Sequence, residues 1–445
     1  MSAVQDVAII GAGVAGLAAA VDLSSAGLRP LLLERKPYVG GRAYSYEHPA
    51  LQETIDSQHV MLGCCVNLVD LCRRSGADQH IRWYSEIPFL EPGGRKSVLR
   101  AGTSVRGSFD FLRAPMLSLV EKAAIGRGLM QFFRGYPQSD SESFAQWLKR
   151  TGQPERAIRH FWEPIVVATL NDSFERCSMR YAGQVFHEAF VKSAEGGRMG
   201  IPTQPLSTFY SHIAELAEQQ GTELRLRTSV ERIEHLAGVW HLHGAEGLIA
   251  KAKYLVLALP FEQTARLISV PNVENFVHAP ITTIHLWFDR DVCDLDHAAL
   301  LDTRIQWLFN KTRIRKTGEA GQYLELVISA SHAELKMGRE VILGSALREL
   351  ELFFPRVREA KVLKSGILKE ARATFSVTPG LDVIRPASNV AGDDLYLAGD
   401  WTASGWPSTM EGGIRSGRLA ATSILGRSTL APELKPDGLA RLFAR

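Results

Sequence analysis

The stretch from Asp6 to Glu34 constrains the fold more than any other part of the chain. Residues 6–10 form an apolar run with β-branched members, which is typical of a buried strand. Three glycines follow with the spacing G-x-G-x-x-G, namely Gly11, Gly13 and Gly16. An alanine-rich stretch then predicts a helix to about Ala26, and residues 29–33 predict a second strand. We therefore expect a strand–helix–strand unit that binds a dinucleotide.

Each glycine of this unit has a physical reason. Gly11 permits the tight turn, Gly13 lets the backbone approach a pyrophosphate, and Gly16 lets the helix pack on the strand. The N-terminus of the helix would face the phosphates with free N–H groups. Glu34 ends the second strand, where its carboxylate can accept hydrogen bonds from a ribose diol. Because that carboxylate disfavours a 2′-phosphate, we do not expect NADP, despite the neighbouring Arg35.

A second pair of glycines, Gly40 and Gly41, is followed by Arg42. These residues can bring another loop to the same pyrophosphate, with the guanidinium as its counter-charge. An ordinary surface turn is the alternative.

The C-terminal region favours the ligand-binding interpretation. A strand over residues 395–398 ends in Gly399 and Asp400, which places Asp400 at the edge where open α/β sheets hold ligands. A helix that begins near Thr409 would direct its N–H groups at the pyrimidine end of an isoalloxazine, an arrangement that stabilises the reduced anion. Together with the N-terminal unit, these features predict FAD as the cofactor.

Composition is that of a globular protein with room for two domains, with 445 residues of which 45% are hydrophobic and 22% charged. The net charge of +3 gives no reason to expect nucleic acid as a partner. The five cysteines are odd in number and lack metal-ligand spacing, so we expect cytoplasmic thiols and no metal site. Cys64 and Cys65 are the only thiols near a motif of the flavin domain, and neither lies in the C-terminal motif. We therefore expect FAD to be bound non-covalently. No signal peptide or membrane-spanning run is recognised.

Polar residues inside two apolar stretches are the candidates for catalysis. His59 interrupts an apolar region that follows the second glycine pair. Glu163 lies beside a tryptophan and a proline within residues 158–171, where burial would raise its pKa and suit it to donate a proton. Asn171 ends the same stretch. Satisfied polar groups of the core and an exposed or ion-paired Glu163 are the alternatives. Pro164 should break or kink a helix there.

The remaining chain predicts a second domain and a return to the first. Residues 81–105 predict β-structure, and residues 109–133 predict apolar helices that line a tunnel or lie on a membrane surface. A substrate-domain helix pair with solvated Arg and Lys is the alternative for the helices. The glycine-rich residues 196–202 predict a turn, and residues 228–234 predict a strand of a β-meander.

The glycine motifs and the C-terminal G-D…M-E-G resemble the FAD-dependent amine oxidase and carotenoid desaturase superfamily. Four internal stretches narrow the resemblance to hydroxysqualene dehydroxylases, also called squalene-associated FAD-dependent desaturases. They are DSQHVMLGCCVNL (56–68), HFWEPIVVATLN (160–171), MGIPTQPLS (199–207) and GWPSTMEGGIRSG (405–417). The resemblance extends over essentially the whole chain.

The resemblance implies an α/β fold class with two domains. One is a Rossmann-like, discontinuous FAD-binding domain made of residues 1–75, 203–265 and 388–445. The other is a mixed α+β substrate domain with an apolar cavity, made of residues 76–202 and 266–387. The residues that the resemblance implies as FAD contacts are Gly11, Gly13, Ala15, Gly16, Glu34, Arg35, Gly40, Gly41, Arg42, Val230, Gly399, Asp400 and Met410.

The implied reaction is the reductive dehydroxylation of hydroxysqualene to squalene, in squalene and hopanoid biosynthesis. It needs a proton for the departing allylic hydroxyl, a reduced flavin and an electron donor that the sequence does not identify. We take His59, Glu163 and Asn171 as candidates for the acid or for groups that hold the hydroxyl. The alternatives are a carotenoid-type isoprenoid desaturase, an amine oxidase and a non-catalytic FAD-binding partner protein. A C30 lipid substrate further suggests peripheral attachment to the inner face of the cell membrane.

Overall fold

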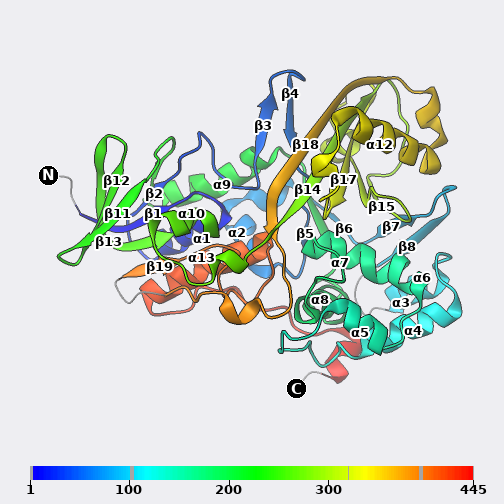
Figure 1. Cartoon of the computed structure of the whole chain (residues 1–445), viewed down its shortest axis with the longest axis horizontal. Helices are drawn as coiled ribbons and strands as arrows, with labels where there is room; N and C mark the ends of the chain where they lie inside the picture. The colour runs from blue at the N-terminus through cyan, green and yellow to red at the C-terminus, as the bar shows by residue number, and fades with distance from the viewer. Residues whose placement is uncertain (1–3, 101–104, 319, 390–393, 444–445) are drawn as a thin grey trace.

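The computed structural model describes residues 4–100, 105–318, 320–389 and 394–443. The molecule is elongated, with a large β-sheet in each half (Figure 1). Helices α3 to α8 gather below the second sheet in this view, and the C-terminus lies beside them.

The first sheet forms the left half of Figure 1 and has the strand order β10-β2-β1-β13-β12-β11, with β19 paired to β13. Strands β10, β2, β1, β13 and β19 pair in parallel, whereas β11, β12 and β13 form an antiparallel meander. The strands are β1 (Val4–Ile10), β2 (Pro30–Leu33), β10 (Glu223–Arg225), β11 (Arg232–Leu236), β12 (Val239–Gly244), β13 (Gly247–Leu257) and β19 (Leu395–Leu397).

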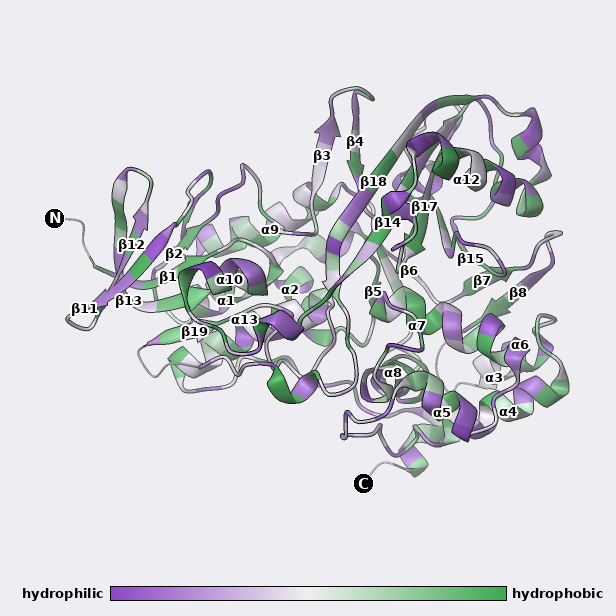
Figure 2. Ribbon diagram, in the orientation of Figure 1, coloured by the Kyte–Doolittle hydropathy of each residue, from purple (hydrophilic) through white to green (hydrophobic). Residues whose placement is uncertain are grey.

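The helices of this half are α1 (Val14–Ser25), α2 (Val66–Ser75), α9 (Leu206–Gln219), α10 (Phe261–Leu267) and α13 (Met410–Leu425). Helix α1 packs against both α9 and α13, and residues 15–24 are all buried. A helix covered on every side has no need of a polar face, which explains why α1 is apolar except for its last turn and Asp22, a buried acid that pairs with Arg74. Figure 2 shows α1 and the central strands of this sheet in green, the hydrophobic end of the scale.

The second sheet has the strand order β18-β14-β17-β16-β15-β7-β8. All of its neighbouring strands are antiparallel except β7 and β15. The strands are β7 (Ile87–Leu90), β8 (Lys96–Leu99), β14 (His278–Phe288), β15 (His297–Leu300), β16 (Trp307–Asn310), β17 (Gln322–Ser329) and β18 (Val362–Phe375). Helix α12 (Arg339–Phe353) packs on this sheet through Ile342, Ala346 and Leu350, which recur at helical spacing on one face.

Two small sheets lie between the halves. Strands β3 (Ser45–His48) and β4 (Glu53–Asp56) form a hairpin, and β9 (Met199–Pro202) lies between β5 (Met61–Leu62) and β6 (Ile81–Tyr84). The other helices are α3 (Val105–Arg113), α4 (Leu119–Met130), α5 (Phe144–Arg150), α6 (Glu155–Ala157), α7 (Glu163–Leu170), α8 (Met179–Val185) and α11 (Lys311–Arg315).

The structure confirms the strand–helix–strand unit at the N-terminus, the α/β fold class and the helix pair within residues 109–133. The strands of the first sheet fall at residues 4–33, 223–257 and 395–397, and the second sheet takes its strands from residues 87–99 and 278–375. The domain boundaries themselves stay a prediction. Of the β-structure expected over residues 81–105, residues 101–104 lie outside the described part of the chain.

Two predictions of local structure are wrong in part. The turn expected over residues 196–202 is present at residues 196–197, whereas residues 199–202 form strand β9, which pairs with β5 and β6. A Cβ on Gly200 would lie 2.9 Å from both Ile81 and Met61. This glycine therefore marks close approach within a sheet, not a chain reversal. The strand expected over residues 228–234 begins only at Arg232, and the residues before it form an irregular segment.

The helix around Pro164 is not broken. Residues Ile158–Trp162 form a π-helical turn that leads directly into α7, with Pro164 in its first turn. The wider turn accommodates a residue that cannot donate a backbone N–H, so helical structure continues across the proline.

Candidate active site

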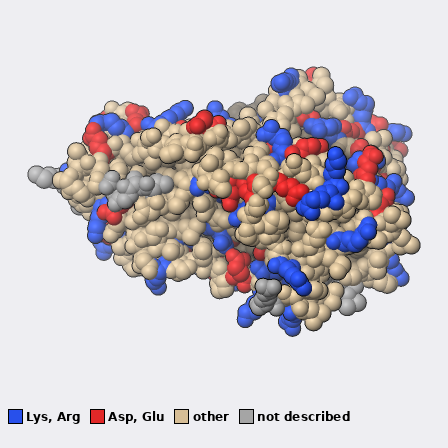
Figure 3. All heavy atoms as spheres, turned by 60° about the horizontal axis from the view of Figure 1, so that its bottom comes forward, with Lys and Arg blue, Asp and Glu red and all other residues tan. Residues whose placement is uncertain are grey.

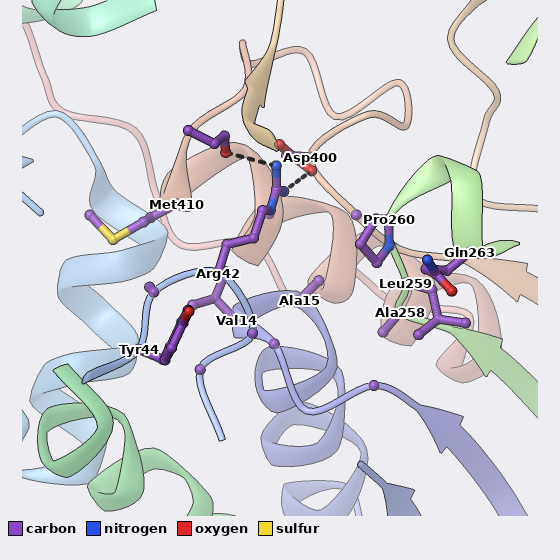
Figure 4. A pocket seen from close by; sticks show the side chains of 18 of the residues that line it. Val14, Ala15, Arg42, Tyr44, Ala258, Leu259, Pro260, Gln263, Asp400 and Met410 are labelled. Atoms are coloured by element: carbon purple, nitrogen blue, oxygen red, sulfur yellow. Dashed lines mark hydrogen bonds and ion pairs between the residues drawn. The ribbon is translucent and has the colours of Figure 1, made fainter. Parts of the chain in front are cut away.

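A cavity of about 690 Å³ lies between the first sheet and the second sheet. Its walls come from the turn after β1, the loop of residues 34–44, the segment Ser57–Val60 and the end of α7. Residues 228–231, strands β14 and β18, Asp400 and the start of α13 complete it. Figure 4 shows side chains of these separate elements converging on one space.

Two glycines of the first motif are fixed by packing. Gly11 has a φ of +103°, and a Cβ there would lie 2.5 Å from the carbonyl oxygen of Ala258. A Cβ on Gly16 would lie 1.9 Å from the carbonyl oxygen of Gly11. Neither position has space for a side chain, so both glycines bring the helix, the turn and β13 together. Gly16 itself is not part of the cavity lining.

Gly13 differs from these two because the space in front of it is open. The nearest atom to a Cβ there would be Cα of Gly41, at 3.7 Å, whereas a Cβ on Gly41 would lie 2.9 Å from Cα of Gly13. The two glycine loops meet backbone to backbone, and the N–H of Gly40 donates to the carbonyl of Ala12 at 2.9 Å. The predicted meeting of the loops is confirmed, and it leaves a bare backbone cradle of the kind that a pyrophosphate fits.

Glu34 lies at one end of the cavity and is 7% exposed. Its Oε2 accepts the N–H of Ala12 and its Oε1 accepts the N–H of Lys36, both at 2.8 Å. A carboxylate has about four acceptor positions, so two remain for a ribose diol. The irregular segment with Val230 lies at the same end, where the N–H of Thr228 donates to the carbonyl of Glu34 at 2.8 Å.

Arg42 and Asp400 form an ion pair with Nη2 and Oδ1 2.5 Å apart, drawn in Figure 4. Oδ2 of Asp400 accepts the hydroxyl of Ser408 at 2.5 Å, and Nη1 of Arg42 donates to the carbonyl of Ala373 at 3.1 Å. The sequence predicted Arg42 as a counter-charge to phosphate and Asp400 as a partner of a ribityl hydroxyl. In the structure the guanidinium of Arg42 and the carboxylate of Asp400 bind each other. Both line the cavity, so they face it as a positive and a negative group side by side.

The helix α13 begins at the cavity with Met410, next to the lining residues Thr409 and Gly413. Thr409 is the N-cap, and its hydroxyl accepts the N–H of Gly412 at 3.1 Å. Glu411 points away from the cavity and is fully buried, where it accepts the backbone N–H groups of Asn67 and Leu68 at the start of α2. Burial raises the pKa of Glu411. This glutamate therefore joins two helices beneath the site.

His59 lines the cavity, as expected, but its environment does not favour an acid. Nδ1 lies 2.7 Å from the carbonyl oxygen of Ser57, so Nδ1 carries the proton of the neutral ring and Nε2 has the lone pair. Burial lowers the pKa of His59, which favours that neutral form. A neutral imidazole of this tautomer can accept a proton at Nε2.

Asn171 also lines the cavity, at the C-terminus of α7. Its Nδ2 donates to the carbonyl of Ala279 at 3.0 Å and to Oγ1 of Thr374 at 2.9 Å, and its Oδ1 accepts the N–H of Ala330 at 2.8 Å. Both donors are used within the protein. Asn171 therefore holds α7 against β14 and β18 and closes the wall.

Glu163 is not among the lining residues, and its own environment is separate. Burial raises the pKa of its carboxyl, and the nearby Glu175 adds to the effect. The structure thus brings His59 and Asn171 to one cavity and leaves Glu163 outside its lining.

Sequence reasoning missed a buried charged cluster beneath the segment Ser57–Val60. Nζ of Lys311 lies 3.2 Å from Asp56 and 2.9 Å from Glu325, and donates to Oε1 of Gln58 at 2.7 Å. Arg315 donates to Asp56 as well, and Glu325 accepts the N–H of Gln58 at 2.5 Å. These contacts fix the backbone that carries His59. The charged residues of the cluster come from strands β4 and β17 and helix α11. Because these elements are far apart in the sequence, no short motif predicts the cluster.

The five cysteines do not line the cavity, and Cys64 is buried away from it. The described residues of the lining thus include no thiol, and the non-covalent binding of FAD stays a prediction. Every predicted cofactor residue except Gly16 does line the cavity.

The fold and the cavity are those of a dinucleotide-binding protein whose second sheet faces the cofactor cradle. The chain belongs to the flavin containing amine oxidoreductase family, whose family model matches residues 14–425. FAD is its cofactor, and the bare cradle at Gly13 and Gly41 together with the free acceptor positions of Glu34 fit such a dinucleotide.

Three similar proteins show the breadth of the family. The zeta-carotene desaturase of Synechocystis sp. (strain ATCC 27184 / PCC 6803 / Kazusa) is 25% identical, over 94% of this chain and 97% of its own length. The 15-cis-phytoene desaturase of Synechococcus elongatus is 26% identical, over 95% of this chain and 96% of its own. The solved structure of cyclohexylamine oxidase from Brevibacterium oxydans IH-35A has a TM-score of 0.68 and 19% identity, covering 95% of this chain and 99% of that one. The last of these shows the fold alone.

Proposed function

We propose that this FAD-dependent oxidoreductase acts on a linear isoprenoid hydrocarbon and removes hydrogen from it to form a double bond. Full-length similarity to a zeta-carotene desaturase and a 15-cis-phytoene desaturase supports this reaction. The hydroxysqualene dehydroxylation that the internal motifs imply is a second candidate.

The observation that carries the proposal is the apolar cavity wall at the end of α7. Ala168, Ile281, Leu368 and Val60 present apolar side chains there. The polar residues of α7 do not interrupt this surface, because the hydroxyl of Thr169 donates to the carbonyl of Ile165 at 2.7 Å. Asn171 likewise directs both donors into the protein. A hydrocarbon can bind against such a wall without leaving a buried polar group unpaired.

Bound FAD supplies two-electron chemistry with hydride as the transferred species. Forming a double bond also requires loss of a proton from the neighbouring carbon. His59 has the character of a base at this wall, since its ring is neutral and Nε2 has the lone pair. Asn171 and the charged cluster beneath Ser57–Val60 hold the wall and the histidine in place. The apolar surface keeps water away from a cationic carbon during the reaction.

One observation favours dehydroxylation. Three of the four motifs that resemble hydroxysqualene dehydroxylases contribute directly to the cavity, through Ser57–Val60, Thr169, Asn171 and Met410, whereas residues 199–207 are not part of its lining. Dehydroxylation needs a proton donor for the departing hydroxyl. The lowered pKa of His59 works against that role, and Glu163, whose pKa is raised, lies outside the lining.

Two anaerobic incubations distinguish desaturation from dehydroxylation. Oxidised enzyme with a quinone acceptor is given phytoene, zeta-carotene or squalene, and prereduced enzyme is given hydroxysqualene. New double bonds in the first incubation support desaturation. Squalene in the second, with no change in the first, overturns it and establishes dehydroxylation.

The role of His59 is tested by His59→Gln. A positioned base is worth about 10²–10⁴ in rate, so desaturation should fall by that factor while the flavin content stays unchanged. The matched variant Glu163→Gln should retain its rate, because Glu163 is not part of the cavity wall. A loss of only a few-fold in His59→Gln would remove the histidine from the mechanism.

A further inference from the structure

Helix α4 is apolar on two faces, although only one of them is covered. Its inner face carries Ala124, Ile125 and Gly128, and a Cβ on Gly128 would lie 2.9 Å from Trp162 and 3.1 Å from Trp147. Its outer face carries Leu119 and Val120, which are 76% and 73% exposed, and Met130, which is also exposed. A surface helix of a soluble domain has polar residues on the outside, so the outer face of α4 is unusual.

The neighbouring helix and the C-terminal end extend this surface. Phe109 and Leu112 of α3 are exposed, and Nζ of Lys122 in α4 donates to the carbonyl of Leu112 at 2.8 Å, which ties the two helices together. The ring of Phe443 lies 5.1 Å from the ring of Phe133, just after α4. Next to it Leu442 is 77% exposed. Segments more than 300 residues apart thus contribute to one apolar surface, which we call the α3–α4 platform.

Charge on the platform is positive. Arg113, Arg127 and Arg134 are exposed, and the guanidinium of Arg113 lies 3.9 Å from the ring centre of Phe109. The acids in the described residues 105–134 already have partners. Asp110 accepts from Arg100 at 2.6 Å, and Glu121 accepts the N–H of Ser118 at 2.6 Å in a capping box.

Figure 3, which brings the bottom of Figure 1 forward, shows Lys and Arg scattered over a largely uncharged surface in the lower right part of the molecule. Apolar side chains flanked by arginines are the combination that binds the interface of an anionic bilayer. No helix among the described residues is long and apolar enough to cross a bilayer.

We propose that the α3–α4 platform docks on the surface of an anionic lipid bilayer. The apolar side chains enter the boundary between headgroups and acyl chains, and the arginines pair with lipid phosphates. A protein partner or a second copy of the chain that covers the platform is the alternative, and the experiment below distinguishes it from a bilayer. The proposal does not depend on which reaction the cavity catalyses, since it is tested without turnover.

The test is flotation of the FAD-bound protein with vesicles of phosphatidylcholine alone and of phosphatidylcholine mixed with phosphatidylglycerol. We expect binding to the mixed vesicles that weakens with salt. The double variant Leu119→Ser/Val120→Ser should weaken the partition coefficient by about tenfold or more, because interfacial burial of each side chain is lost. Arg127→Gln should weaken binding to the mixed vesicles alone, by about fivefold.

Matched controls come from exposed residues elsewhere. Val341→Ser/Val383→Ser removes two exposed apolar side chains outside the platform, and Arg348→Gln removes an exposed arginine of α12. Both should float like the parent protein, and all variants should retain their FAD. Failure of the parent protein to float with anionic vesicles overturns the proposal. So does a dimer in size-exclusion chromatography that Leu119→Ser/Val120→Ser dissociates, since a second copy would then cover the platform.

Discussion

The two walls of the cavity are built by different means. On the side of the first sheet two glycine loops present bare backbone, flanked by the side chains of Glu34 and Arg42. A Cβ on Gly11 would lie 2.5 Å from the carbonyl oxygen of Ala258, and a Cβ on Gly41 would lie 2.9 Å from Cα of Gly13. On the side of the second sheet the surface is made of side chains, which Asn171 and the cluster around Lys311 hold in place.

This difference has consequences for function. A backbone wall binds what every dinucleotide has, a pyrophosphate, and it does so by N–H groups and close approach. A side-chain wall can change its shape and polarity by substitution, so it is the part that sets the substrate. Substitutions in the backbone wall should therefore impair FAD binding, whereas substitutions in the side-chain wall should impair stability and turnover. The variants below test that expectation.

The largest effect is expected for Gly13→Val. The backbone around Gly13 can accept a side chain, since no atom lies within 3.7 Å of its Cβ position. The new side chain would instead occupy the cradle, so the protein should fold and bind no FAD. Circular dichroism and the visible absorbance of the purified protein measure the two properties. Gly126→Ala, at an α4 position with nothing near its Cβ, is the control and should keep its flavin. A yellow Gly13→Val protein would show that the cradle is elsewhere.

Lys311→Met, beneath the side-chain wall, should lower stability and leave FAD binding intact, which is the reverse of the result expected for Gly13→Val. The substitution leaves the buried carboxylates of Asp56 and Glu325 without their shared cation, which costs about 3–5 kcal/mol of unfolding free energy. FAD should still bind, but turnover should fall because the segment with His59 loses its support.

Arg313→Met is the matched control for that variant, since Arg313 is half exposed and pairs with Asp296 at 2.8 Å. Arg313→Met should lower the free energy of unfolding by no more than about 1 kcal/mol. Denaturant titration compares the two variants. Equal costs would mean that the cluster around Lys311 has no special role.

The same difference explains what the sequence could predict. Gly11, Gly13 and Gly16 lie within six residues, and their function follows from local geometry, so motif spacing was sufficient. The network of Asp56, Lys311 and Glu325 joins residues more than 250 positions apart, and no spacing encodes it. Strand β18 was missed for a related reason: most of its side chains are only partly buried, so its sequence lacks a clear apolar alternation.

Ambiguous signals account for the other differences. Glycine and proline in residues 199–202 suggested a turn, whereas tertiary packing places that segment between two strands. The predicted places of Arg42 and Asp400 in the cavity are right, but a sequence cannot show that two residues 358 positions apart form an ion pair.

A smaller effect on the backbone wall is expected for Glu34→Ala. The carboxylate satisfies the N–H groups of Ala12 and Lys36 in addition to any ribose diol. Its loss should weaken FAD binding by about 1–3 kcal/mol, which is the usual cost of unpaired buried polar groups. Titration of the apoprotein with FAD measures the change. Glu231→Ala, an exposed residue of the same end of the cavity, should change the affinity by less than about 0.5 kcal/mol. Equal losses in the two variants would contradict a specific role for Glu34.

The last effect concerns a residue of the second sheet and is absent at neutral pH, because it develops only in acid. His285 is fully buried in β14, where Nδ1 lies 2.8 Å from the hydroxyl of Tyr323. Burial lowers its pKa from 6.5 to about 3, although Asp56 opposes the shift. Below pH 6.5 the unfolded chain takes up a proton at this residue and the native protein does not, so stability falls as the pH falls towards 3. The loss is about 1.4 kcal/mol for each pH unit in that window, and stability above pH 6.5 does not change. His285→Gln should flatten the acid side of a plot of unfolding free energy against pH. His235→Gln, at an exposed position of β11 in the first sheet, should leave the slope as it is. If both variants or neither flatten the curve, the acid sensitivity does not arise from His285.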